Sequence, residues 1–162
     1  MSWLEWLSTT PVAVWMRESD SIWGYPTILF LHTLGLGILV GFTAAIDFRV
    51  LGFAEQLPLV PLARFFPLIW IGFWINAVSG ALLLIMTPAK AANPTFFVKM
   101  ACIALGVVNL WLLKRHLFRP VQDPASAIPF AARVLAISSL VLWTGAITAG
   151  RLMAYIGNVH KF

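Results

Sequence analysis

Four long apolar segments, separated by short polar connections, dominate the chain. They run from about Ile22 to Ala45, Pro67 to Met86, Phe96 to Leu113 and Ala131 to Tyr155. Each is close to the roughly 20 residues that an α-helix needs to cross the hydrocarbon core of a bilayer. The pattern predicts four transmembrane helices, and the short connections predict that consecutive helices run antiparallel.

The first 20 residues follow a different pattern, in which tryptophans mix with charged residues. Thr10-Pro11 is a typical helix start, with threonine as the cap and proline in the first turn. We expect residues 2–18 to form two short amphipathic turns at the membrane interface, where tryptophan is favoured. The tryptophans of this interfacial segment are Trp3, Trp6 and Trp15.

The composition indicates a protein that lies mostly in the bilayer. Of the 162 residues, 60% are hydrophobic and 10% are charged, whereas soluble domains carry about 25% charged residues. The predicted fold class is therefore all-α: an integral membrane four-helix bundle that forms one domain over residues 1–162. The net charge of +5 comes from residues scattered near the ends of the spans, which favours lipid headgroups over nucleic acid as partners.

Basic residues in two connections predict the orientation of the bundle. The connection after the first span holds Arg49 and Arg64. The connection after the third span holds Lys114, Arg115 and Arg119, and Arg133 begins the fourth span. Connections rich in lysine and arginine face the cytoplasm. We therefore expect both chain termini on the outer side.

His32 is the least expected residue of the first span, because it interrupts an otherwise apolar run. An ionisable side chain at membrane depth is costly and marks a candidate functional site. In the predicted topology, Lys99, Arg151 and Arg17 lie above it on the outer side. One interpretation is a clamp for an anionic group above the imidazole. The alternative is that these cations extend to the lipid headgroups.

Polar residues recur at helical spacing within the other spans, and the recurrence predicts faces that turn into the bundle. They are Asn76 in the second span, Asn109 in the third, and Thr144 and Thr148 in the fourth. Gly37 and Gly41 of the first span form a G-x-x-x-G packing pair. Interhelical packing alone explains these residues.

Asp47 and Arg49 form a second charged pair near the inner end of the first span. One explanation is a charge cluster that sets the depth of the helix in the membrane. Pairing with Arg64 or Arg133 of the neighbouring connections is another. Both explanations place the two residues at the cytoplasmic boundary.

A haem b fits the outer site, because a neutral imidazole supplies an axial ligand and the two propionates need cations at the membrane surface. His32 would bind the iron, and Lys99, Arg151 and Arg17 would hold the propionates. No second histidine lies at the same depth, since His116 falls near the opposite face. The haem would then be five-coordinate, take a methionine, or be shared across a homodimer.

Two other functions remain open from the residues alone. Copper is the alternative ligand, because thioether and imidazole groups suit Cu(I) and several methionines map to the outer side. A copper or small-solute transporter would use them. The other alternative is an accessory subunit of a larger membrane complex, with His32 as a packing residue. The outer-side methionines are Met16, Met86, Met100 and Met153.

Motifs in three of the spans resemble those of a bacterial family. They are His32, Asp47-x-Arg49, Asn93-Pro94-x-x-Phe97-x-Lys99 and Gly150-Arg151-Leu152-x-Ala154-Tyr155. Over nearly its whole length the chain resembles a family of four-helix inner-membrane proteins, a domain of unknown function. The resemblance implies a multi-pass protein of the bacterial inner membrane, which would make the outer termini periplasmic.

A more distant resemblance bears on the cofactor. The chain is similar to the four-helix haem-containing protoporphyrinogen oxidase and to copper-resistance D membrane proteins. The first-helix histidine is matched by His32, and the third-helix lysine by Lys99. This resemblance implies haem b or copper as ligand classes and carries no activity over to this chain.

Overall fold

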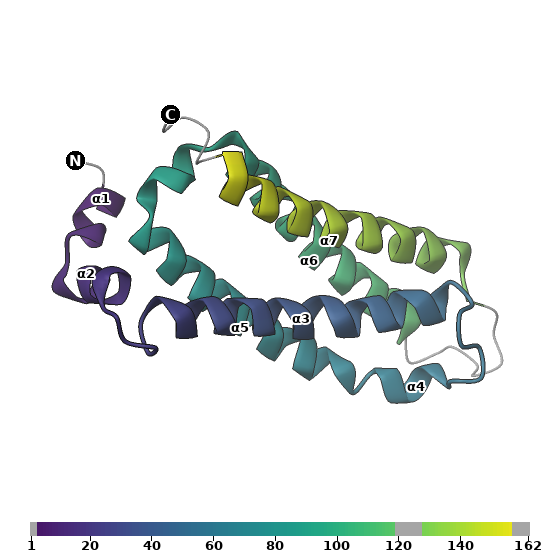
Figure 1. The fold of residues 1–162 in the computed structure, drawn as a ribbon. Coiled ribbons are helices and arrows are strands. Elements are labelled where there is room, and N and C mark those ends of the chain that lie inside the picture. The colour runs from purple at the N-terminus through teal and green to yellow at the C-terminus, as the bar shows by residue number, and fades with distance from the viewer. Residues whose placement is uncertain (1–2, 119–127, 157–162) are drawn as a thin grey trace.

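Four long helices carry the fold in the computed structural model, which describes residues 3–118 and 128–156 (Figure 1). They are α3 (Tyr25–Val50), α5 (Phe65–Met86), α6 (Pro94–Leu117) and α7 (Phe130–Ile156). Each is long and apolar enough to cross a membrane. The predicted all-α, four-helix membrane fold is confirmed, and the described part of the chain contains no strand.

The long helices differ from the predicted spans mainly at their ends. α3 begins at Tyr25 rather than Ile22, after a Gly24 cap and with Pro26 in its first turn. It continues through Asp47 and Arg49 to Val50, five residues past the predicted end. A helix of this length is about 39 Å long, which exceeds the roughly 30 Å hydrocarbon core. Polar residues can therefore occupy its last turns without ending it.

Two short helices precede the bundle: α1 (Trp3–Ser8) and α2 (Pro11–Glu18). The Thr10 side chain caps α2 by accepting a hydrogen bond from Ala13 N at 3.4 Å, as predicted. The buried side of α2 carries Met16, which packs with Ile28 and Met86. The opposite side, with Trp15, is exposed.

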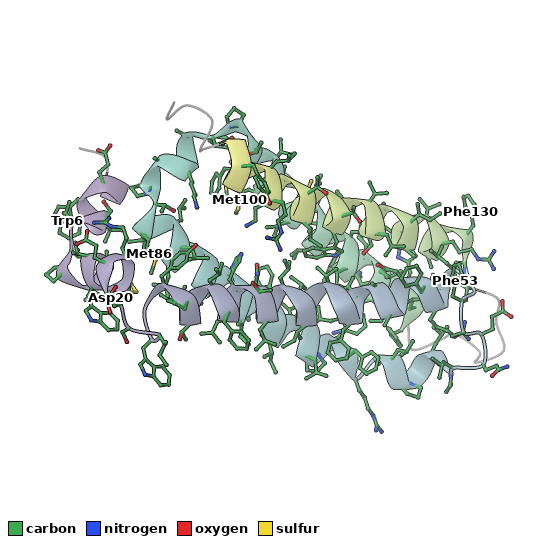
Figure 2. All side chains as sticks on the ribbon, in the orientation of Figure 1. Trp6, Asp20, Phe53, Met86, Met100 and Phe130 are labelled. Carbon is green, nitrogen blue, oxygen red and sulfur yellow. The ribbon has the colours of Figure 1, made fainter. Side chains whose placement is uncertain are left out.

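The bundle has two ends, which we name after the short helices beside them. The α2 end holds α1, α2 and the short helix η1 (Pro88–Ala92) between α5 and α6. The α4 end holds α4 (Leu59–Leu62) between α3 and α5. Figure 2 shows Trp6 and Met86 at the α2 end, and Phe53 and Phe130 at the α4 end.

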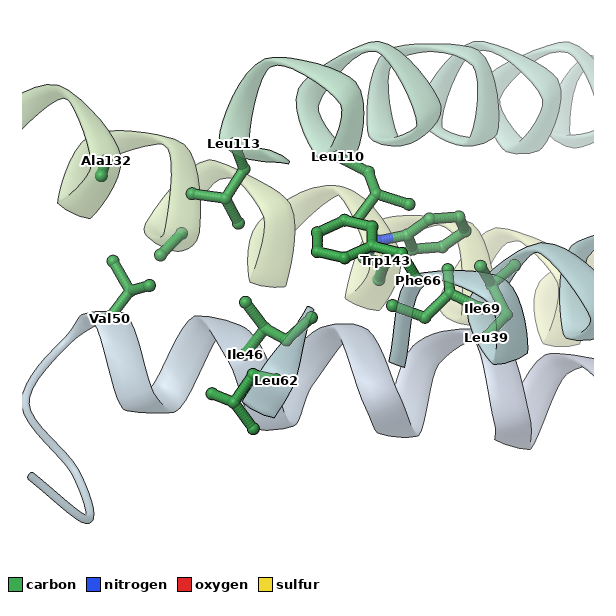
Figure 3. Packing of buried hydrophobic residues seen from close by; sticks show 11 residues of the cluster. Leu39, Ile46, Val50, Leu62, Phe66, Ile69, Leu110, Leu113, Ala132 and Trp143 are labelled. Carbon is green, nitrogen blue, oxygen red and sulfur yellow. The ribbon is translucent and has the colours of Figure 1, made fainter. Parts of the chain in front are cut away.

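The long helices form two antiparallel pairs, α3 with α5 and α6 with α7, and α3 also lies against α7. The pairs converge at the α4 end and diverge toward the α2 end (Figure 1). The main hydrophobic cluster therefore lies in the α4 half of the bundle (Figure 3). On α6, no residue from Pro94 to Leu105 is buried. The cluster consists of Leu39, Ile46, Val50, Leu62, Phe66, Ile69, Leu110, Leu113, Ala132, Ala136 and Trp143.

α3 and α5 approach closely at one pair of glycines. A Cβ atom added to Gly35 would lie 2.7 Å from the backbone nitrogen of Asn76 and 2.8 Å from the carbonyl oxygen of Gly72. A Cβ added to Gly72 would meet the Leu39 backbone at 2.8 Å. Both positions therefore require glycine.

The predicted packing pair Gly37 and Gly41 does not lie in this contact. A Cβ at either position would meet nothing within 4 Å. The interface with α5 follows Gly35 and Leu39, which lie on another face of α3. The G-x-x-x-G pair is therefore open toward the surroundings of this chain.

The predicted inward faces are correct for α5 and α6. Asn76 is buried against α3. Asn109 donates hydrogen bonds to Leu135 O at 3.1 Å and to Ser138 Oγ at 2.7 Å, both on α7. Lys99 packs on Gly150 and Cys102 on Gly145, again on α7. Polar groups of both helices thus turn away from lipid.

The predicted face of α7 is wrong, because Thr144 and Thr148 are exposed. The buried face follows Ala132, Ala136, Ser139 and Trp143 instead. The Thr148 hydroxyl donates to the carbonyl of Thr144 at 2.8 Å. A hydroxyl satisfied by its own helix can face lipid, so a threonine stripe does not mark an inward face.

Candidate cofactor site around His32

His32 lies in the α2 half of the bundle and is held by α5. Its Nδ1 lies 3.0 Å from the backbone oxygen of Asn76 and 3.2 Å from Ser79 Oγ. A second hydrogen bond joins the same two residues, because Asn76 Nδ2 donates to the backbone oxygen of His32 at 2.8 Å. This reciprocal pair fixes the imidazole on α5.

These partners determine which ring nitrogen carries the proton. A backbone carbonyl oxygen accepts and cannot donate, so Nδ1 is the donor to Asn76. The Ser79 hydroxyl donates to Ile75 O at 2.6 Å, which leaves its oxygen free to accept. In the neutral ring, Nε2 then holds an unprotonated lone pair. Within residues 3–118 and 128–156, no hydrogen bond occupies this atom.

This arrangement is typical of a histidine that binds metal. The ligating nitrogen is free, while the other ring nitrogen donates to a backbone carbonyl and orients the ring. Gly80 makes room for the ring, since a Cβ there would lie 3.0 Å from His32 Cε1. The sequence Asn76–Gly80 therefore supplies both the anchor and the space.

Lys99 lies near His32, and Lys90 lies near Lys99. The Lys99 ammonium is close enough to His32 for its charge to act on the ring, and Lys90 of η1 acts in the same way on Lys99. Neither lysine forms an ion pair with a described residue. The structure thus brings His32 and Lys99 together and adds Lys90, which the sequence did not single out.

The other two predicted cations occupy different surroundings. Arg17 forms an ion pair with its neighbour Glu18 at 2.9 Å on the exposed side of α2. Arg151 is exposed on α7, next to the Gly150 on which Lys99 packs. No hydrogen bond or ion pair between described residues joins either arginine to His32 or Lys99.

The second charged pair separates in the structure. Asp47 is completely buried, whereas Arg49 points to the connection and donates to Leu57 O and, at 2.9 Å, to Glu55 O. Asp47 forms no ion pair with a described residue. Asp47 therefore belongs to the interior of the bundle, whereas Arg49 holds the connection after α3.

Other possible metal ligands do not gather near His32. The Nδ1 of His116 donates to Leu112 O at 2.9 Å, near the α4 end of α6. Met16 and Met86 are buried in a small hydrophobic cluster. The described residues contain no group of three or more His, Cys, Asp and Glu side chains that would hold a metal ion. The copper alternative stays a prediction, and these two methionines have a packing role.

Simple sequence signals point to Lys90 and Ser139, two residues that the helical spacing of polar positions does not predict. Lys90 follows Pro88 in the short connection directly before the Asn93-Pro94 start of α6. Ala132, Ala136 and Ser139 are spaced four and then three residues apart, which places them on one face of a helix. Small residues at this spacing mark a packed helix face.

Comparison of the chain with protein-family models, curated proteins and solved structures finds no match. The resemblance to the bacterial four-helix family therefore stays a prediction.

Proposed function

We propose that the protein binds haem b in the membrane, with His32 as an axial ligand. The observation that carries the proposal is the anchored imidazole, whose Nδ1 bonds to α5 while no described residue bonds to Nε2. An axial ligand from a helix face needs this arrangement. The part of α6 that carries Lys99 also supports it, because no residue from Pro94 to Leu105 is buried against the rest of the described chain.

Lys99 and Lys90 support the same ligand. Two ammonium groups without an acidic partner among the described residues favour an anion beside them. The propionates of haem b supply that charge, and Lys99 would hold one of them. Arg151 is the nearest further cation in sequence to the Lys99 contact on Gly150. Arg17 would have to exchange its Glu18 partner to take part.

Bound haem would supply one-electron redox chemistry. His32 orients the ring, and Asn76 and Ser79 determine which nitrogen faces the ligand. The iron would be bound by His32 alone, by His32 with a methionine, or by His32 residues of two copies of the chain. The outward Gly37 and Gly41 of α3 would allow close approach of such a copy.

The visible spectrum tests the proposal. Protein purified from haem-replete cells should show a Soret band, and His32→Ala should reduce bound haem to background because the iron loses its ligand. Lys99→Ala should weaken haem binding about tenfold, the effect of losing one charge-assisted hydrogen bond. His116→Ala is the matched control and should leave the spectrum unchanged. A wild-type protein without a Soret band, or an unchanged band in His32→Ala, would overturn the proposal.

We further propose that the protein lies in a bacterial inner membrane with both termini in the periplasm. The basic residues Arg49, Arg64 and Lys114 of the α4 end support this orientation. Single cysteines in a Cys102→Ser background test it. An impermeant maleimide added to whole cells should label Glu18→Cys at the α2 end and spare Glu55→Cys at the α4 end. The reverse labelling would contradict the orientation.

A further inference from the structure

Asp47 is a buried acid that forms no ion pair with any described residue. Its side chain is 0% exposed, and neither carboxyl oxygen has a hydrogen-bond partner within the described residues. Isolating a charged carboxylate from water costs several kcal/mol or more unless a partner compensates. The Asp47 carboxyl group therefore requires a bound cation, a bound proton or a hydrogen-bond donor.

Every described basic residue near the α4 end is engaged or directed elsewhere. Arg49 donates to two carbonyls of the connection. Lys114 lies over the Phe66 ring at 5.1 Å, and Arg115 lies over the Trp111 ring at 4.6 Å. His116 bonds to its own helix. Arg64, before α5, and Arg133, on α7, are exposed.

Ser139 of α7 faces Asp47. The hydroxyl is close enough to the carboxyl group to act on it as a hydrogen-bonding neighbour, although no hydrogen bond of full geometry joins the two groups. Ser139 is 0% exposed and its oxygen has no described partner. The other buried hydroxyls behave differently: Thr43 and Ser79 donate to carbonyls of their own helices at 2.7 and 2.6 Å. The Ser139 hydroxyl is thus free for the carboxyl group.

Further unsatisfied atoms lie at the same level of the bundle. Asn109 donates to Ser138, the neighbour of Ser139, while its Oδ1 has no described partner. Trp143, one turn beyond Ser139, has an unpartnered Nε1. Buried polar atoms are rarely left without partners. Asp47 and Ser139 therefore belong to a larger set of buried polar groups that lack a described partner.

A proton meets the requirements of this site better than a metal cation. Ions such as Ca²⁺ and Mg²⁺ take about six or more oxygen ligands, whereas Asp47 and Ser139 together supply three. A protonated carboxyl is neutral and has one donor and one acceptor side, which suits a free hydroxyl.

We propose that Asp47 and Ser139 form a proton-binding site in which the Asp47 carboxyl is a neutral acid in the folded protein. The proton comes from the aqueous phase at the α4 end, because Asp47 lies only about 5 Å along the helix from Val50, the last residue of α3. One O–H bond forms on the carboxylate while one O–H bond of a hydronium ion breaks, which leaves water in the aqueous phase. The site is independent of the proposed haem site.

Infrared spectroscopy of the full chain in nanodiscs at neutral pH tests the proposal. The wild type should show the C=O stretching band of a protonated carboxylic acid, shifted in D₂O. Asp47→Asn should lose the band and remain folded, because an amide has nearly the shape of a neutral acid. Glu55→Gln, at an exposed position, is the matched control and should keep it. Ser139→Ala should shift the band, since the acid loses its nearest hydroxyl.

Isotope labelling makes the assignment independent of mutation. The chain has three aspartates, so ¹³C at their carboxyl carbons should move the acid band, while labelled glutamate should not. Absence of the band in the wild type, or an Asp47→Asn variant that fails to fold, would overturn the proposal. Stabilisation by Na⁺ over choline in the wild type, absent from Asp47→Asn, would identify a cation site instead and also overturn it.

Discussion

Replacing Trp143 with alanine should cost about 3 kcal/mol of folding free energy, at the lower end of the range for buried tryptophan. Trp143 is 2% exposed and belongs to the cluster that joins the two helix pairs. Its ring lies against Gly106, where an added Cβ would be 3.2 Å from two ring atoms. No other described residue of α7 fills a comparable volume in this core.

The free-energy cost of Trp143→Ala has a different physical origin in a membrane protein than in a soluble protein. Lipid chains are as apolar as the protein core, so transfer from water contributes little to helix association. The cost comes from the cavity and from lost dispersion contacts. Loss of the unpartnered Nε1 offsets part of this cost.

Unfolding in detergent micelles with increasing dodecyl sulfate, followed by circular dichroism, measures the effect. Trp74→Ala is the control, because Trp74 is 62% exposed on α5 and faces away from the core. Its midpoint should stay close to that of the wild type. Equal midpoints for Trp143→Ala and Trp74→Ala would contradict the packing of the cluster.

Replacing Gly35 with alanine should destabilise the bundle by about 1–3 kcal/mol, the range for overpacking a close contact. The added methyl group would meet backbone atoms of α5 at 2.7 and 2.8 Å. Backbone cannot move aside as a flexible side chain does, so α3 and α5 must separate. The displacement reaches the His32 site, since His32 lies one turn earlier on the same helix and bonds to Asn76.

Gly35→Ala should therefore lower both the unfolding midpoint and the content of bound haem. Gly37→Ala is the matched control, with the same chemical change on a face where a Cβ meets nothing within 4 Å. It should keep both properties and gain slightly in helix propensity. Identical behaviour of the two variants would show that α3 and α5 do not meet at Gly35.

The site was partly predictable from sequence, because its central residue violates a strong rule. A histidine in an apolar span is costly, so His32 is recognisable without any structure. The carbonyl of Asn76 that orients the ring was not predictable, because every residue carries a carbonyl and no pattern distinguishes this one. Lys90 was also missed, since its relation to Lys99 depends on how η1 folds back beside α6.

The two faces of α7 illustrate the same limit. Thr144 and Thr148 have the spacing of an inward stripe, yet the structure buries Ser139 and Trp143. Hydropathy does not separate these faces, because threonine can satisfy its hydroxyl within its own helix. The side chains that α3 and α6 present to α7 decide which of the two faces is buried.

The sequence by itself determined the number of spans, the all-α class, the two amphipathic helices before the bundle and the prominence of His32. These features follow from a local requirement: a backbone in lipid must satisfy its hydrogen bonds internally, so length and apolar composition suffice. Only the tertiary structure decided that Gly35 rather than Gly37 meets α5, that Asp47 is buried with no ion pair to a described residue, and which nitrogen of His32 bonds to α5. These depend on the rotation and approach of whole helices, which side-chain shape determines and apolar composition does not.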